Sequence, residues 1–169
     1  VDSNVLAGSG LVGIVIEAGP TYSRVRSIVD DASNVSAMML STSDTCMVRG
    51  DLKLMADGRL RFEKLPNNDN KIEAGEQVVT SHVSPRFLQG LFIGYVSDIE
   101  VDANNLTRSG YITPAVDFGK LQEVLVITTT KRNLLEADDS QDTQSPEAAN
   151  QASPEDTQGS QESQDGEGE

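Results

Sequence analysis

Two glycine-framed apolar stretches are the most informative parts of the sequence: Gly10-Leu11-Val12-Gly13-Ile14-Val15 and Gly90-Leu91-Phe92-Ile93-Gly94-Tyr95-Val96. Each follows a short apolar segment and a loop, with Val5-Leu6-Ala7 before the first and Val78-Val79-Thr80-Ser81 before the second. Short apolar runs bounded by turn residues are typical of buried strands, and a Gly inside a strand permits a bend or a close backbone approach. We therefore expect two equivalent core strands.

The same order of features continues after both stretches. A second strand ends in Asp, at Asp30 and at Asp117, and an apolar strand follows over residues 35–39 and 124–127. A repeated order of elements indicates repeated architecture. The sequence thus predicts an all-β fold of two small six-stranded antiparallel β-barrels, the first of them incomplete at its N-terminal side in this chain.

This organisation divides the chain into three expected parts. Residues 1–41 supply the C-terminal strands of the first barrel, residues 42–132 form the second barrel, and residues 133–169 form a disordered acidic tail. Ser, Gln, Glu, Asp, Pro and Gly dominate that tail, so it cannot bury enough apolar surface to offset the entropy of ordering.

Short strands are expected throughout residues 1–132, with no long helical period. The candidate strands cover 11–17, 23–29, 35–40, 52–56, 60–64, 77–80, 91–101, 108–113 and 122–129. Asp57-Gly58 separates two of them, and an Asp-Gly pair supplies the positive φ that a tight hairpin turn requires. We therefore predict a β-hairpin over residues 52–64.

The charge is concentrated at one end of the chain. Of 169 residues, the first 132 hold all 13 Lys and Arg and 16 of the 27 acids, whereas residues 133–169 hold 11 acids and no base. Phosphate binding requires a clustered basic surface, and none is visible in the sequence. We therefore exclude nucleic acid as a partner.

Membrane attachment is expected only upstream of this sequence. No apolar run reaches the roughly 18 residues that a membrane-spanning helix needs, and no signal-peptide pattern is present. The chain begins at Val1 without an initiator Met. We interpret it as the C-terminal part of a longer protein whose anchor would precede it.

Three blocks of the sequence resemble the MreC family of bacterial rod shape-determining proteins, in order and with family-like spacing over about residues 3–130. The first block is Gly10-Leu11-Val12-Gly13, Val15-Ile16-Glu17-Ala18-Gly19-Pro20, Tyr22-Ser23-Arg24-Val25, Ile28-Val29-Asp30 and Ser33-Asn34-Val35-Ser36. The second is Gly75-Glu76-Gln77-Val78-Val79-Thr80-Ser81, Gln89-Gly90-Leu91 and Ile93-Gly94-Tyr95-Val96. The third is Thr113-Pro114-Ala115-Val116-Asp117-Phe118, Leu121 and Glu123-Val124-Leu125-Val126-Ile127.

This resemblance implies two β-barrels carried on a coiled coil and an N-terminal membrane helix. It also implies a non-catalytic scaffold that organises peptidoglycan synthesis on the outer side of the bacterial cytoplasmic membrane. The implied partners are MreD, the MreB system, the RodA glycosyltransferase and a class B penicillin-binding protein, together with self-association. The resemblance implies no cofactor.

A chymotrypsin-like two-barrel hydrolase or a ligand-binding β-barrel is the alternative. Serine hydrolysis requires a His base, an Asp that orients it, and a Ser beside oxyanion-hole amides. His82 is the single His, and Ser9 and Ser109 each precede Gly without the Gly-Asp-Ser-Gly-Gly frame. We therefore expect no enzyme activity and assign no catalytic residue.

No metal site is assigned either. Asp98, Glu100 and Asp102 alternate along one expected strand face and resemble a solvated face more than a calcium loop, since the loop's Gly and distal Glu are missing. Asp30-Asp31 is read as a capped turn. Cys46, the single Cys, excludes an intramolecular disulfide and is expected to be buried. Gly13 and Gly94 do not form a phosphate loop.

Overall fold

The structure, a computed structural model, describes residues 1–69 and 71–139. The open-sheet strands are β1 (Asn4–Ala7), β2 (Gly10–Ala18), β3 (Ser23–Ser27) and β10 (Leu125–Val126). The barrel strands are β4 (Asn34–Met39), β5 (Thr45–Arg49), β6 (Leu60–Pro66), β7 (Gln77–Thr80), β8 (Phe92–Val101) and β9 (Thr107–Pro114). The two helices are α1 (Leu52–Ala56) and α2 (Lys131–Asp139).

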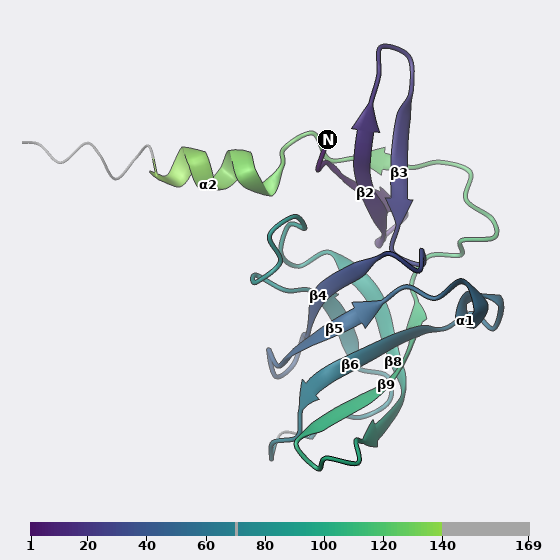
Figure 1. Cartoon of the computed structure of the whole chain (residues 1–169), viewed down its shortest axis with the longest axis vertical. Helices are drawn as coiled ribbons and strands as arrows, with labels where there is room; N and C mark the ends of the chain where they lie inside the picture. The colour runs from purple at the N-terminus through teal and green to yellow at the C-terminus, as the bar shows by residue number, and fades with distance from the viewer. Residues whose placement is uncertain (70, 140–169) are drawn as a thin grey trace, which may run out of the picture.

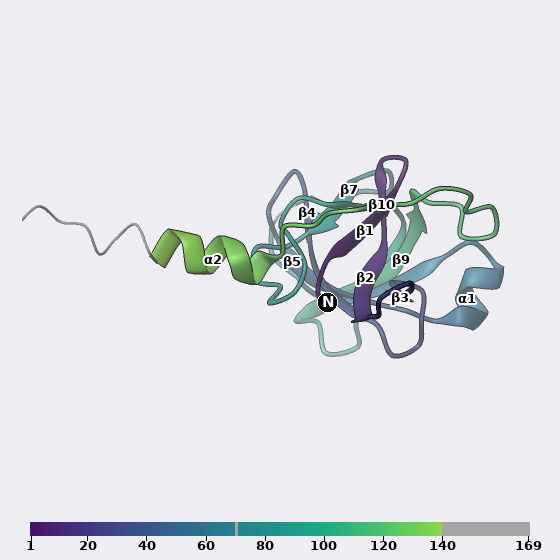
Figure 2. The ribbon, with the colours of Figure 1, turned by 90° about the horizontal axis from the view of Figure 1, so that it is seen from above.

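All strand pairs are antiparallel and form two sheets. Six strands close into a barrel in the order β4-β5-β6-β9-β8-β7, and four form an open sheet in the order β10-β1-β2-β3. The open sheet stands above the barrel, as Figure 1 and the perpendicular view in Figure 2 show. The predicted all-β fold, with one complete six-stranded barrel and one incomplete unit, is confirmed.

The strands are shared between the sheets differently from the predicted division at residues 41 and 42. Strand β4 belongs to the closed barrel, and β10 lies beside β1 in the open sheet. The chain leaves each sheet at an Asp turn: the Asp30 carboxylate accepts from the Ala32 amide at 2.8 Å, and the Asp117 carboxylate accepts from the Gly119 amide at 3.0 Å. Each turn redirects the chain across to the other sheet.

The predicted hairpin over residues 52–64 is wrong, because residues 52–56 form helix α1. The Asp51 side chain accepts hydrogen bonds from the Lys53 and Leu54 amides and so caps the helix N-terminus. Gly58, at a φ of 68°, follows the helix end. The strand that pairs with β6 is therefore β5, which lies outside the predicted strands.

The prediction of a disordered tail from residue 133 is wrong at its start. Residues 133–139 continue α2, which begins at Lys131 and projects from the body in Figure 1. The rest of the predicted tail, residues 140–169, lies outside the described residues.

One apolar core joins the two sheets. Phe62, Leu60 and Ile93 from the barrel are fully buried, and Leu11 and Ile14 of β2 belong to the same cluster. A second, smaller cluster, built on Val5, Val12, Val15 and Val116, lies under the open sheet. Burial of aliphatic surface on both sides of the junction stabilises the two sheets as one body.

The predicted repeat is present in the structure as two copies of one four-strand unit. β1, β2, β3 and β4 of the first copy correspond to β7, β8, β9 and β10 of the second. The pairs Val5↔Gly13 and Val78↔Gly94 match, and a register shift follows Val5 and Val78 alike. The pairs Val5↔Val126 and Val78↔Met39 match as well, so each copy gives its fourth strand to the first strand of the other.

Hydrogen bonds outside the strand ladders repeat too. The Val15 amide donates to the Ser3 carbonyl at 2.9 Å, and the Val96 amide donates to the Glu76 carbonyl at 2.8 Å. Before each of these acceptors stands a residue with positive φ, Asp2 at 64° and Gly75 at 95°. A shared unusual backbone conformation at matching places supports a true duplication.

Candidate functional site

A groove with a cavity volume of about 350 Å³ lies at the junction of the open sheet and the barrel. Its walls come from β2 and β3, from the segment that crosses to β4, from β4 and β5, and from the loop of residues 81–90. The lining residues are Ile14, Arg26, Ala32, Ser33, Asn34, Ser36, Met47, Ser84, Pro85, Arg86 and Phe87. Both copies of the repeat therefore contribute to this groove.

The groove combines an apolar floor with positive charge. Ile14 and Phe87 are buried, Arg26 is half-buried, and Arg86 is exposed and pairs with Asp2 at 2.8 Å. Apolar surface flanked by guanidinium groups suits a protein segment that carries apolar and acidic side chains. The polar side chains of the lining are those of Arg, Ser and Asn, which offer hydrogen-bond donors to a bound segment.

Contacts from distant parts of the sequence hold the loop of residues 81–90 in place. The buried Asn4 side chain accepts from the Leu88 amide at 2.8 Å and donates to the Arg86 carbonyl at 3.3 Å. Lys131, at the start of α2, donates its ammonium hydrogens to the carbonyls of His82, at 2.6 Å, and of Ser84. These roles were not predictable from the sequence, because partners more than 40 residues apart leave no local signal.

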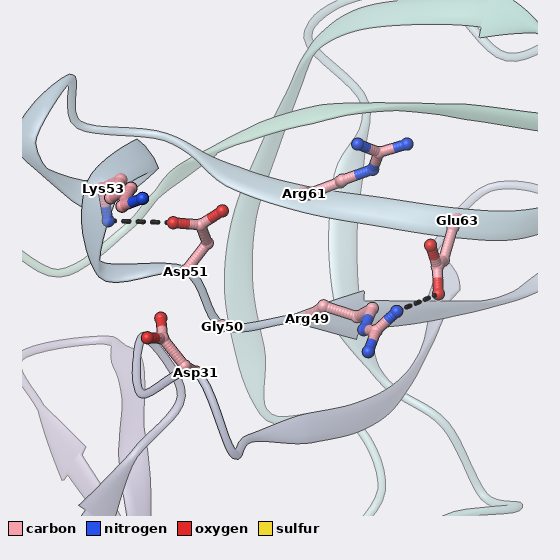
Figure 3. A pocket seen from close by; sticks show the side chains of 7 residues that line it. All are labelled: Asp31, Arg49, Gly50, Asp51, Lys53, Arg61 and Glu63. Carbon is pink, nitrogen blue, oxygen red and sulfur yellow. Dashed lines mark hydrogen bonds and ion pairs between the residues drawn. The ribbon is translucent and has the colours of Figure 1, made fainter.

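A second, larger pocket of about 520 Å³ is charged rather than apolar and lies where α1 meets β5 and β6 (Figure 3). It is lined by Asp31, Arg49, Gly50, Asp51, Lys53, Arg61 and Glu63. Its carboxylates serve the fold: Asp31 accepts from the Leu52 amide at 2.9 Å, Asp51 caps α1, and Glu63 pairs with Arg49 at 3.2 Å. These contacts stabilise the connection through α1.

The residues considered for hydrolysis lie on separate elements with other roles. His82 is exposed, and its main-chain carbonyl accepts from Lys131. Ser9 lies in the exposed turn between β1 and β2, and the Ser109 hydroxyl donates to Asp102. Through these contacts, Ser109 and the loop that contains His82 stabilise the fold.

The acidic residues considered for calcium are arranged as an exposed face with one structural member. Asp98 and Glu100 are exposed on β8, while Asp102 accepts from the Thr107 and Ser109 hydroxyls at the base of the β8–β9 turn. Those hydrogen bonds, that from Ser109 first, lower the pKa of Asp102. Within residues 1–69 and 71–139, no three His, Cys, Asp or Glu side chains gather in a group that would hold a metal ion.

Cys46 and the two strand glycines have structural environments. Burial raises the pKa of the Cys46 thiol to about 12, which leaves the nucleophilic thiolate unpopulated at neutral pH. A Cβ at Gly13 would lie 2.1 Å from the Arg26 carbonyl oxygen, and one at Gly94 would lie 2.2 Å from that of Thr113. Both glycines therefore permit close strand contact, as the sequence predicted.

Neither of the helices seen in the described part of the chain has the length and apolar character to cross a membrane.

Comparison with known proteins gives one consistent match. The family model described as "Rod shape-determining protein MreC, barrel core" matches residues 1–128. The cell shape-determining protein MreC of Listeria monocytogenes is 31% identical over 132 residues, which cover 75% of this chain and 43% of that protein.

Solved structures agree with this match. An MreC structure from Listeria monocytogenes has a TM-score of 0.67 at 30% identity, covering 78% of this chain and 61% of that one. The MreC in a complex between penicillin-binding protein PBP2 and MreC from Helicobacter pylori has a TM-score of 0.57 at 19% identity, covering 73% of this chain and 74% of that one. The second likeness shows the fold alone.

Proposed function

Because the chain belongs to the MreC family, we propose that it is a non-catalytic scaffold of the cell-elongation machinery, which maintains cell shape by organising peptidoglycan synthesis proteins. Support comes from the family's description as rod shape-determining and from the complex of a Helicobacter pylori MreC with a penicillin-binding protein. The chain spans less than half the length of the curated relative from Listeria monocytogenes. Activities of the whole protein are therefore part of this proposal.

The proposed partners are a class B penicillin-binding protein, MreD, the MreB system and RodA, together with further copies of this chain. The proposed location is the outer side of the bacterial cytoplasmic membrane, with attachment through a segment upstream of this sequence. Extracytoplasmic partners of this kind meet a β-rich surface, where strand edges and grooves between sheets accept extended segments.

The groove between the two sheets is the observation that carries the proposal. It is apolar at Ile14, Met47 and Phe87 and positively charged at Arg26, while the Arg86 guanidinium pairs with Asp2. Its two walls belong to one continuous core, so the groove is preorganised and a partner segment binds without first ordering it.

Capture from detergent-solubilised bacterial membranes tests the proposal. The immobilised chain, extended upstream, is expected to recover cell-wall synthesis proteins. Arg26→Glu should reduce recovery about tenfold, because it places a negative charge in a groove suited to acidic segments. Arg24→Glu is the matched control, since Arg24 lies on the same strand but outside the groove lining and pairs with Glu17.

Two results would contradict this function. Equal recovery by both variants would remove the groove from the binding surface. Failure of the wild type to recover any cell-wall synthesis protein, together with hydrolysis that disappears in His82→Ala, would replace the scaffold with the two-barrel hydrolase.

A further inference from the structure

The loop of residues 81–90 distinguishes the two copies of the repeat. In the first copy, residues 8–9 join β1 to β2 in a tight turn, whereas in the second copy residues 81–91 join β7 to β8. The longer connection supplies Ser84, Pro85, Arg86 and Phe87 to the groove wall. The insertion therefore builds a wall that the tight turn of the first copy does not provide.

The C-terminal segment holds this wall from outside. Lys131 bonds to the carbonyls of His82 and Ser84, and the preceding strand β10 is fastened to β1. The Ile127 amide donates to the Asn4 carbonyl at 2.8 Å, and the Asn4 side chain bonds to Leu88 and Arg86. A continuous series of hydrogen bonds thus links strand β10, Asn4 and the loop.

Strand β10 is shorter and more exposed than β4, its counterpart in the first copy. β10 has two residues, and Leu125 and Val126 are 66% and 43% exposed. Their counterparts in β4, Met38 and Met39, are 8% and 0% exposed within a six-residue strand. Local opening is easiest where few apolar contacts and exposed backbone hydrogen bonds hold an element. Only residues 127–130 separate β10 from Lys131, so we expect opening at β10 to release the Lys131 contacts as well.

We propose that residues 125–139 act as a latch on the groove between the sheets. With the latch docked, Lys131 and Asn4 hold residues 82–88 as the wall that receives a partner segment. Release of β10 and α2 loosens that wall and weakens partner binding, and an occupied groove in turn holds the latch in place, because such coupling is reciprocal. This regulation rests on the proposed scaffold function.

Hydrogen exchange on two latch variants tests the contact chain. Lys131→Met removes the donor and keeps most of the side-chain stem, while Ile127→Pro removes the amide that bonds to Asn4 without altering the loop. Both should accelerate amide exchange across residues 82–88 about tenfold, because Lys131→Met removes charged hydrogen bonds to the loop and Ile127→Pro removes a backbone hydrogen bond to Asn4. Arg132→Met, at the exposed neighbouring position, should leave exchange unchanged. Unchanged exchange in both latch variants would overturn the latch.

Binding of a purified class B penicillin-binding protein tests the coupling. Both latch variants should bind it several-fold more weakly than wild type and Arg132→Met. Faster loop exchange with unchanged affinity would overturn the coupling and leave the scaffold function standing. Faster exchange in a chain whose wild type does not bind this partner would instead contradict the proposed function and support the hold of the latch on the loop.

Discussion

The two copies of the repeated unit share their strand pairing and register, but the first three strands of the second copy lie in a closed barrel and those of the first copy lie in an open sheet. In the second copy, β7, β8 and β9 are joined by β4, β5 and β6 into a closed barrel, whereas β1, β2 and β3 are joined by β10 alone. Strand β4, the fourth strand of the first copy, lies in the closed barrel and is mostly buried. Strand β10, the fourth strand of the second copy, lies in the open sheet and is exposed. The difference shows that burial of the fourth strand depends on its place in the sheet, inside the closed barrel for β4 and at the outer edge of the open sheet for β10, rather than on the repeated pattern itself.

The reciprocal exchange of fourth strands makes the two copies interdependent. β4 leaves the first copy to complete the barrel, and β10 returns from the second copy to extend the open sheet. Neither sheet keeps its full set of strands if the chain is cut between them. Each matched pair of residues therefore offers the same substitution in a closed and in an open setting.

The matched glycines should give the largest difference between the copies. Gly94→Ala places a Cβ 2.2 Å from the Thr113 carbonyl oxygen inside the closed barrel, where neighbouring strands are fixed on both sides. We expect a loss of about 4 kcal/mol in the free energy of unfolding. Gly13→Ala should cost roughly half as much, because β3 has an unpaired outer edge and is free to shift. Urea unfolding measures both, and equal losses would show that the open sheet is as rigid as the barrel.

The matched fourth-strand residues should differ next. Met39→Ala removes a fully buried side chain and leaves a cavity, at a cost of about 3 kcal/mol. Val126→Ala removes an exposed side chain and should cost less than about 0.5 kcal/mol. Thermal unfolding of the two variants provides the comparison. A large effect of Val126→Ala would reveal that a further element covers β10 in solution.

For the first residues of β1 and β7, the larger loss of stability is expected in the first copy. Asn4→Ala leaves the Leu88 amide without its side-chain acceptor and should cost about 2 kcal/mol. Gln77→Ala, the corresponding change in the second copy, alters an exposed residue and should be nearly neutral. Chemical denaturation of both variants checks this. A neutral Asn4→Ala would mean that the loop of residues 81–90 holds its shape unaided.

The smallest expected effect lies at the β8–β9 turn, where the second copy has Asp102. Hydrogen bonds from Ser109 and Thr107 lower its folded-state pKa below the ordinary value of 3.8. The unfolded chain therefore binds this proton first, so the stabilising contribution of Asp102 is complete above pH 3.8 and disappears as the pH falls through the lowered folded-state value. The melting temperatures of wild type and Asp102→Asn should differ at neutral pH and converge in acid. A constant difference across that range would contradict this assignment.

The sequence was sufficient for features that depend on neighbouring residues. The glycine-framed apolar runs around Gly13 and Gly94 predicted the paired core strands, and Asp30 and Asp117 indicated where the chain turns after the next strand. The predicted hairpin over residues 52–64 is wrong for a local reason. Asp51 caps a helix, and Asp57-Gly58 is as suited to ending a helix as to turning a hairpin. Short segments with two compatible turn chemistries are decided by their surroundings.

Residue type and short-range periodicity were enough to predict the all-β class and the repeat, because both depend on neighbouring residues. Three features became visible only in the folded chain: β4 and β10 exchange sheets, the loop of residues 81–90 forms one wall of the groove, and Lys131 and Asn4 hold that loop. Strand pairing and side-chain bonds across more than 40 residues depend on which backbone edges and carbonyls the folded chain brings together. No local pattern encodes that choice, since the backbone groups that pair are the same at every residue.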